Sequence, residues 1–183
     1  MTAFRNDEVR KMVYLFQYES PLGGMTAFSD GTSVTGLHFG GKEDNGICQD
    51  GIYTEKMLPV FEQLKCWLDL YFQKKIPDFM PPAVLQGSEF RMAVWDILKQ
   101  IPYGQTLTYG DIAKMVAKQR NQQYMAAQAV GGALRNNPIA ILVPCHRVLG
   151  SGGKLTGYAG GLDKKKALLA LEYEASRLAR EVL

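Results

Sequence analysis

Residues 108–143, TYGDIAKMVAKQRNQQYMAAQAVGGALRNNPIAILV, decide how the second half of this 183-residue chain folds. The stretch opens with TYGD, a capping-box pattern that predicts a short helix over 109–116. A polar turn leads to a second expected helix over 125–135, and an apolar strand is expected over 139–143. Two short helices joined by a turn and followed by a short strand predict a winged helix-turn-helix.

Longer helices are expected on either side of this stretch. Ser88 is a suitable N-cap, and the apolar residues after it recur at helical spacing until the Pro102-Tyr103-Gly104 turn. After the glycine-rich segment GSGGKLTGYAGGL, a final helix is expected over 163–180.

The first part of the chain has the pattern of a small sheet with one helix. Residues 12–18, 25–29 and 34–39 are rich in β-formers and are separated by glycine-containing turns, which predicts a β-meander. The polar, glycine-rich stretch 40–51 is expected to be a loop. Apolar residues at helical spacing over 54–74 predict an amphipathic helix that packs on the sheet.

A proline-rich connector and a change of charge divide the chain near residue 85. Residues 1–85 carry eight Lys/Arg against eleven Asp/Glu, whereas residues 86–183 carry thirteen against seven. The expected fold is therefore α+β with two domains, a structural α/β domain with its connector over 1–85 and the winged helix-turn-helix over 86–183. The basic second half suits a polyanionic partner.

Composition excludes several classes of protein. No apolar run is long enough to span a bilayer, and the polar N-terminus has no signal-peptide pattern, so we expect a cytoplasmic protein, or a nuclear one in a eukaryote. Three cysteines without a CxxC pair, and two distant histidines, argue for free thiols and against a structural zinc site. These residues are Cys48, Cys66, Cys145, His38 and His146.

Cys145 and His146 are candidates for nucleophilic chemistry. A reactive thiol needs a base or cation that favours the thiolate, but neighbours on an extended strand point to opposite faces. Pro144 is well placed to start a turn that would bring the two together, or a water would have to bridge them. Glu172, on the Leu- and Ala-rich face of the last helix, is the candidate that orients the imidazole. The alternative is that Cys145 and His146 are ordinary core residues.

The string PCHRV, preceded by AVGGALRNNP and followed by GYAGGLDKKKALLALE, resembles the O6-alkylguanine-DNA alkyltransferases. The resemblance extends back through SEFRMAVWDILKQIPYGQTLTYGDIA and, more weakly, to YESPLGG. It implies a ribonuclease H-like first domain, and it implies repair of O6-alkylguanine in double-stranded DNA after base flipping through the minor groove, with O4-alkylthymine as a possible second lesion. Each molecule would act once, as a monomer, without a cofactor or metal.

The resemblance also assigns roles to residues. Cys145 would accept the alkyl group, activated through a water by His146 with Glu172 behind it. Asn137 would brace the turn that presents the thiol, and Tyr109 would help to rotate the nucleotide and hydrogen-bond the flipped base. The pocket that receives the base would be formed by Pro144, Tyr158, the N–H of Ala159, and the carbonyls of Cys145 and Val148.

The helix over 125–135 would enter the minor groove, where small side chains fit and sequence is poorly read. Its mid-helix glycines favour close approach of another surface, and tight packing against a neighbouring helix is the alternative. The residues that this interpretation places on DNA are Ala126, Ala127, Gln128, Ala129, Gly131 and Arg135, with Lys114 and Arg120 as phosphate contacts.

Gln128 departs from the family, which usually has an arginine there to fill the gap left by the flipped base. Glutamine can occupy that space but adds no attraction to phosphate, so weaker or slower repair of duplex DNA is expected. Ala159 has a small side chain that could admit larger alkyl groups.

Other functions remain possible from the sequence alone. A non-catalytic, alkyltransferase-like protein would bind lesions but lack the acceptor cysteine, which is present here. A cysteine hydrolase would need an oxyanion-hole motif, and a transcription factor would prefer a sequence in undamaged DNA. The first domain carries no recognisable chemistry and is expected to be structural.

Overall fold

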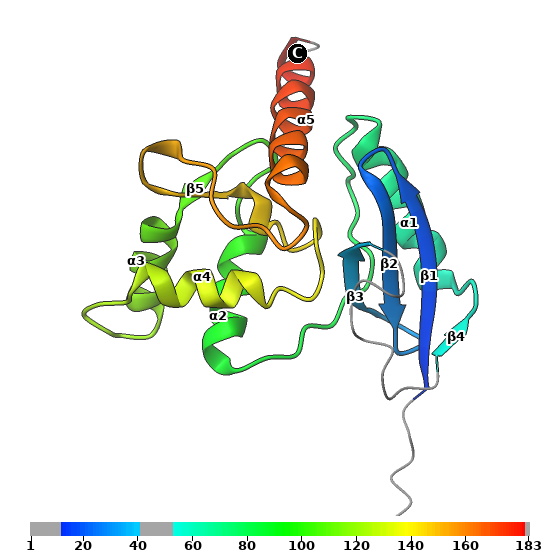
Figure 1. Cartoon of the computed structure of the whole chain (residues 1–183), viewed down its shortest axis with the longest axis horizontal. Coiled ribbons are helices and arrows are strands. Elements are labelled where there is room, and N and C mark those ends of the chain that lie inside the picture. The colour runs from blue at the N-terminus through cyan, green and yellow to red at the C-terminus, as the bar shows by residue number, and fades with distance from the viewer. Residues whose placement is uncertain (1–11, 41–52, 182–183) are drawn as a thin grey trace, which may run out of the picture.

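The computed structural model describes residues 12–40 and 53–181. Cys48, the N-terminal segment and nearly all of the expected loop lie outside the described residues. The meander is confirmed: β1 (Val13–Ser20), β2 (Gly23–Ser29) and β3 (Val34–Phe39) form antiparallel pairs in a sheet of order β3-β2-β1-β4 (Figure 1). The fourth strand, β4 (Tyr53–Glu55), pairs parallel with β1 and was not anticipated.

Helix α1 (Pro59–Phe72) packs on this sheet and begins five residues later than the predicted 54–74. Leu58 is the N-cap and Pro59 takes the first helical position. Proline lacks the backbone N–H that a helix interior needs but fits the first turn, so the chain before it is free to form β4. The buried face of α1 carries Phe61, Leu64 and Tyr71 into the core.

The second half is helical, as expected. Ser88 caps α2 by accepting a hydrogen bond from the N–H of Arg91, and the capping box between Thr108 and Asp111 is present at the start of α3. Two short strands pair in parallel beside these helices. The elements are α2 (Glu89–Lys99), β5 (Leu107–Thr108), α3 (Tyr109–Gln119), α4 (Ala127–Arg135), β6 (Val148–Leu149), the 3-10 turn η3 (Ser151–Gly153) and α5 (Leu162–Glu181).

The predicted strand over 139–143 is wrong. Only Ile139 makes a β-bridge, to Leu37, and the chain then turns back on itself at Ile141, whose φ is 68°. The turn satisfies its own backbone, because the N–H of Leu142 donates to the carbonyl of Ala140 at 2.8 Å. An apolar run of five residues fits a buried turn as well as a buried strand, and periodicity cannot separate them.

The edge strand β3 joins the sheet to this turn. The N–H of Leu37 donates to the carbonyl of Pro138 at 2.9 Å, and the N–H of Ala140 donates to the carbonyl of Leu37 at 2.8 Å. Buried residues of both halves form one continuous hydrophobic cluster. The sheet therefore positions the turn that leads to Cys145. Within the described ranges, no helix has both the length and the apolar character needed to cross a membrane.

Candidate active site

The turn after α4 is braced by Asn137. Its Nδ2 donates to the carbonyl of Val143 at 2.8 Å, and its Oδ1 accepts from the N–H of Ile139 at 3.0 Å. The same Nδ2 lies 3.1 Å from Sγ of Cys145 and donates to it. One amide thus fixes both the loop and the sulfur, and the structure places Asn137 where the sequence analysis expected it.

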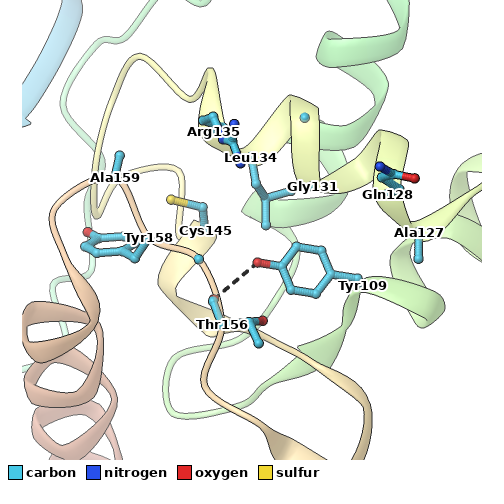
Figure 2. Close-up of a pocket in the computed structure, with 12 residues that line it drawn as sticks. Tyr109, Ala127, Gln128, Gly131, Leu134, Arg135, Cys145, Thr156, Tyr158 and Ala159 are labelled. Carbon is cyan, nitrogen blue, oxygen red and sulfur yellow. Dashed lines mark hydrogen bonds between the residues drawn. The ribbon is translucent and has the colours of Figure 1, made fainter.

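Cys145 is 6% exposed and opens on a cavity of about 760 Å³. It begins the 3-10 turn η2 (Cys145–Arg147), directly after Pro144. Figure 2 shows its sulfur on one side of the cavity, between α4 and the segment that carries Tyr158. The lining residues are Tyr109, Ala127, Gln128, Gly131, Gly132, Leu134, Arg135, Cys145, Thr156, Gly157, Tyr158 and Ala159.

His146, the residue after Cys145, forms a buried pair with Glu172, and neither side chain has exposed surface. Nε2 of His146 lies 2.7 Å from Oε1 of Glu172, so Nε2 carries the proton and donates it to the carboxylate. Nδ1 is buried and has no hydrogen-bond partner among the described residues. The lone pair of Nδ1 is therefore available to accept a proton.

Burial and charge set the resting ionisation of these groups. Burial raises the pKa of the Cys145 thiol, although the Asn137 hydrogen bond and the Lys165 charge act against this. Burial also lowers the pKa of His146. For Glu172, burial is outweighed by hydrogen bonds and charges from His146 and Arg147, which lower its pKa to about 2. At neutral pH the site holds a thiol, a neutral imidazole and a carboxylate.

The other residues expected around the base are brought together only in part. Tyr109 lines the cavity and its hydroxyl lies 3.4 Å from the carbonyl of Thr156. Tyr158 and Ala159 form the opposite wall, and the buried Tyr158 hydroxyl is unpaired within the described chain. Val148 is buried outside the lining, and its carbonyl already accepts from Lys165.

Pro144 and the Cys145 carbonyl also make contacts within the protein. Pro144 caps η2 and is absent from the residues that line the cavity. The carbonyl of Cys145 accepts from the N–H of Val148. Both carbonyls expected to face a base amino group thus hold a donor from the protein.

Helix α4 forms one rim of the cavity. Ala127, Gln128, Gly131 and Arg135 line it, and Gln128 and Arg135 are exposed at its edge (Figure 2). Ala126 is the N-cap of this helix.

The remaining residues expected on DNA lie outside the lining. Ala129 is exposed on α4 and Lys114 is exposed on α3. Arg120 lies 3.9 Å from Glu89 in an ion pair.

Lys165 is a residue of the site that the sequence did not single out. It is fully buried, and its Nζ donates to the carbonyls of Val148 at 2.5 Å, Thr156 at 2.6 Å and Gly157 at 3.3 Å. It thereby holds the cavity wall in place and sets a positive charge near Cys145. Its position three residues before Leu168 on the buried face of α5 was the available signal.

Arg147 was also missed, although it follows His146 directly. Its Nε and Nη2 lie 2.8 and 2.9 Å from the two oxygens of Glu172, and its Nη1 donates to the carbonyl of Ile101 at 2.7 Å. This two-point contact fixes the carboxylate plane and compensates its buried charge.

The first half of the chain, which is expected to be structural, contributes one direct contact to the site. Tyr71 of α1 is fully buried, and its hydroxyl donates to Oε1 of Glu172 at 2.8 Å. A contact between residues 101 positions apart has no local sequence signature.

Comparisons with known proteins place this arrangement in one family. Residues 89–174 match the family described as 6-O-methylguanine DNA methyltransferase, DNA binding domain, and residues 13–82 match its ribonuclease-like domain. The chain belongs to the 6-O-methylguanine DNA methyltransferase family.

Its relatives cover nearly the whole chain. A methylated-DNA–protein-cysteine methyltransferase of Methanosarcina acetivorans is 40% identical over 161 residues, which are 87% of this chain and 98% of that protein. The crystal structure of Mycobacterium tuberculosis OGT in complex with DNA has a TM-score of 0.75 at 36% identity and covers 90% of this chain and 94% of that one. An O6-methylguanine DNA methyltransferase from Methanococcus jannaschii has a TM-score of 0.58 at 32% identity, covering 87% and 92%.

Proposed function

We propose that this protein repairs DNA by direct reversal, moving the alkyl group of O6-alkylguanine in double-stranded DNA onto Sγ of Cys145. The observation that carries the proposal is the sulfur of Cys145 at the wall of a cavity of about 760 Å³, with an unoccupied proton acceptor, Nδ1, on the next residue, His146. The family to which the chain belongs supports the same reaction.

The chemistry follows from the resting ionisation of the site. The Sγ proton passes to Nδ1 of His146 through a water, because no direct hydrogen bond joins the two groups within the described residues. The carboxylate of Glu172 stabilises the imidazolium that forms. The thiolate then attacks the alkyl carbon, a C–S bond forms, and the C–O bond breaks with its electron pair going to guanine.

The leaving base and the protein product complete the reaction. Tyr109, whose hydroxyl lies at the cavity beside Thr156, donates a hydrogen bond to the departing guanine, and the guanine anion takes up a proton from water. The thioether on Cys145 has no easy leaving group, so each molecule acts once and no cofactor takes part.

The damaged base enters the cavity when its nucleotide is rotated out of the DNA duplex. A stacked guanine cannot align its O6 substituent with a sulfur inside a cavity, so the base must leave the stack. Ala127, Gly131 and Gly132 form a narrow surface on α4 beside the cavity, suited to the minor groove, and Gln128 occupies the space that the base vacates.

Intact mass after mixing with DNA that contains O6-methylguanine tests the proposal. A single mass increase of one methylene is expected, located on the peptide with Cys145 and absent from Cys145→Ala. DNA binding without any mass increase would favour a non-catalytic lesion-binding protein instead. Two further proposals are tested on the protein alone: light scattering tests whether it is a monomer, and limited proteolysis tests whether it divides into two domains near residue 85.

A further inference from the structure

Glu172 is contacted by five hydrogen-bond donors, and one comes from the far half of the chain. Oε1 accepts from His146, from Nη2 of Arg147 and from the hydroxyl of Tyr71. Oε2 accepts from Nε of Arg147 and from the N–H of Gly104 at 3.1 Å. Tyr71 thus binds the same oxygen as the imidazole, and its Oη lies 3.5 Å from Nε2 of His146.

We propose that Tyr71 is a positioning residue for the alkyl transfer. Its hydroxyl fixes Oε1 of Glu172, the oxygen that accepts the hydrogen bond from the catalytic imidazole. This inference rests on the proposed function. It gives the ribonuclease-like half of the chain a direct part in the chemistry, through α1.

The packing around Tyr71 separates the role of the hydroxyl from that of the ring. The ring stacks on Trp67 at 5.3 Å with an interplanar angle of 13° and meets Tyr103 edge-on at 5.7 Å. Phenylalanine would fill the same apolar place. The hydroxyl therefore serves the carboxylate, and because burial raises the pKa of Tyr71 well above its ordinary value, it stays a protonated donor.

The hydroxyl also adjusts the basicity of His146. Each donor on Oε1 withdraws negative charge that would otherwise stabilise the imidazolium. Without the Tyr71 hydroxyl, the carboxylate attracts the imidazole proton more strongly and the pKa of His146 rises. A larger fraction of His146 is then protonated at mildly acidic pH and cannot accept the thiol proton. The titratable or charged groups around His146 and Glu172 are Tyr71, Tyr103, Cys145, Arg147, Tyr158 and Lys165.

The test is Tyr71→Phe, with Tyr18→Phe as a matched control. The hydroxyl of Tyr18 donates to Oδ1 of Asp69 at 2.9 Å. The control therefore also removes a tyrosine–carboxylate hydrogen bond, but one that joins β1 to α1 and lies away from the cavity. Single-turnover transfer rates are measured from pH 5 to 9 with saturating O6-methylguanine DNA. For Tyr71→Phe we expect a rate about fivefold lower near neutrality, the effect of one modest hydrogen bond. The acid limb of its pH profile should move to higher pH, with DNA affinity unchanged.

A second readout needs no DNA. The rate at which iodoacetamide alkylates Cys145, followed on its own peptide to exclude other cysteines, is measured over the same pH range. The acid limb should again move to higher pH in Tyr71→Phe and stay in place in Tyr18→Phe. If the wild type fails to accept a methyl group while this shift persists, the proposed function is wrong and the positioning role stands.

Three results would overturn the role of Tyr71. One is a rate loss that is equal at every pH, and another is the same behaviour in both variants. The third concerns the wild type and applies even if Tyr71→Phe does not fold. Proton NMR should show a slowly exchanging Tyr71 hydroxyl with Overhauser contacts to the Nε2 proton of His146, and a resolved Tyr71 hydroxyl without those contacts excludes the hydrogen bond.

Discussion

Nζ of Lys165 lies 2.5 Å from the carbonyl oxygen of Val148, so a lysine of the last helix is sealed beneath the wall of the cavity that holds Cys145. Three carbonyls converge on this ammonium group. Its charge also opposes the effect of burial on the thiol. Wall geometry and sulfur reactivity therefore depend on one side chain.

Lys165→Met should lower both the free energy of unfolding and the reactivity of the Cys145 thiol. Leaving buried carbonyls without a donor costs roughly 3 kcal/mol of unfolding free energy. Loss of the positive charge raises the pKa of Cys145 further and slows its alkylation. Urea unfolding and iodoacetamide kinetics measure the two effects. Lys166→Met is the control, because Lys166 is exposed on the same helix; equal behaviour of the two variants would contradict the prediction.

Asn137→Asp should distinguish the two roles of this residue, which are to hold the turn before Cys145 and to donate a hydrogen bond to its sulfur. The carboxylate keeps an acceptor for the N–H of Ile139 but loses the donor to Sγ of Cys145 and to the carbonyl of Val143. A negative charge beside the sulfur raises the thiol pKa, so alkyl transfer at neutral pH should fall by about tenfold or more. Transfer rates at pH 7 and 9 check this, since a higher pH should recover part of the loss. A deficit that is unchanged at pH 9 would point to a distorted turn instead.

Gln128→Arg should strengthen the interaction with duplex DNA. Gln128 is exposed at the edge of the cavity on α4, where an arginine adds attraction to phosphate and a larger side chain to fill the gap in the stack. Tighter binding and faster transfer, each by severalfold, are expected in duplex titrations and single-turnover assays. Gln123→Arg places the same charge in the exposed turn before α4. If this control gains as much as Gln128→Arg, net charge rather than position explains the effect.

Acid should destabilise the protein in two steps. Burial lowers the pKa of His146, so in mild acid the unfolded chain binds a proton at this residue and the folded protein does not. The free energy of unfolding therefore falls as pH drops below about 6.5. The pKa of Glu172 is lowered to about 2 from its ordinary value of 4.5, so its contribution to stability is complete above pH 4.5 and is lost as pH falls toward 2.

Urea unfolding at a series of pH values measures both steps. Glu172→Gln should lose the lower step and should cost roughly 3–5 kcal/mol at neutral pH, because Arg147 is left buried without its partner. A Glu172→Gln protein with the same acid dependence as the wild type would contradict this assignment.

Local chemistry made much of this structure predictable. Helix starts could be predicted at Ser88 and at Thr108 with Asp111, because an N-cap side chain accepts a hydrogen bond from an N–H group within three residues of itself. Glu172 stood out because a helical period places it on a buried face. The failures have a different physical origin. Tyr71 reaches Glu172 only through tertiary packing, and the turn at Ile141 depends on backbone hydrogen bonds and on pairing with Leu37, which an apolar run does not encode.

The environment of the reactive sulfur is assembled from both ends of the chain. Leu37 pairs with the turn before it, and Lys165 and Glu172 arrive from the last helix. Because Cys145 precedes α5 in the chain, it is synthesised before Lys165 and Glu172. The sulfur therefore acquires the charge of Lys165 and the His146–Glu172 pair only once α5 has formed and packed against the rest of the protein.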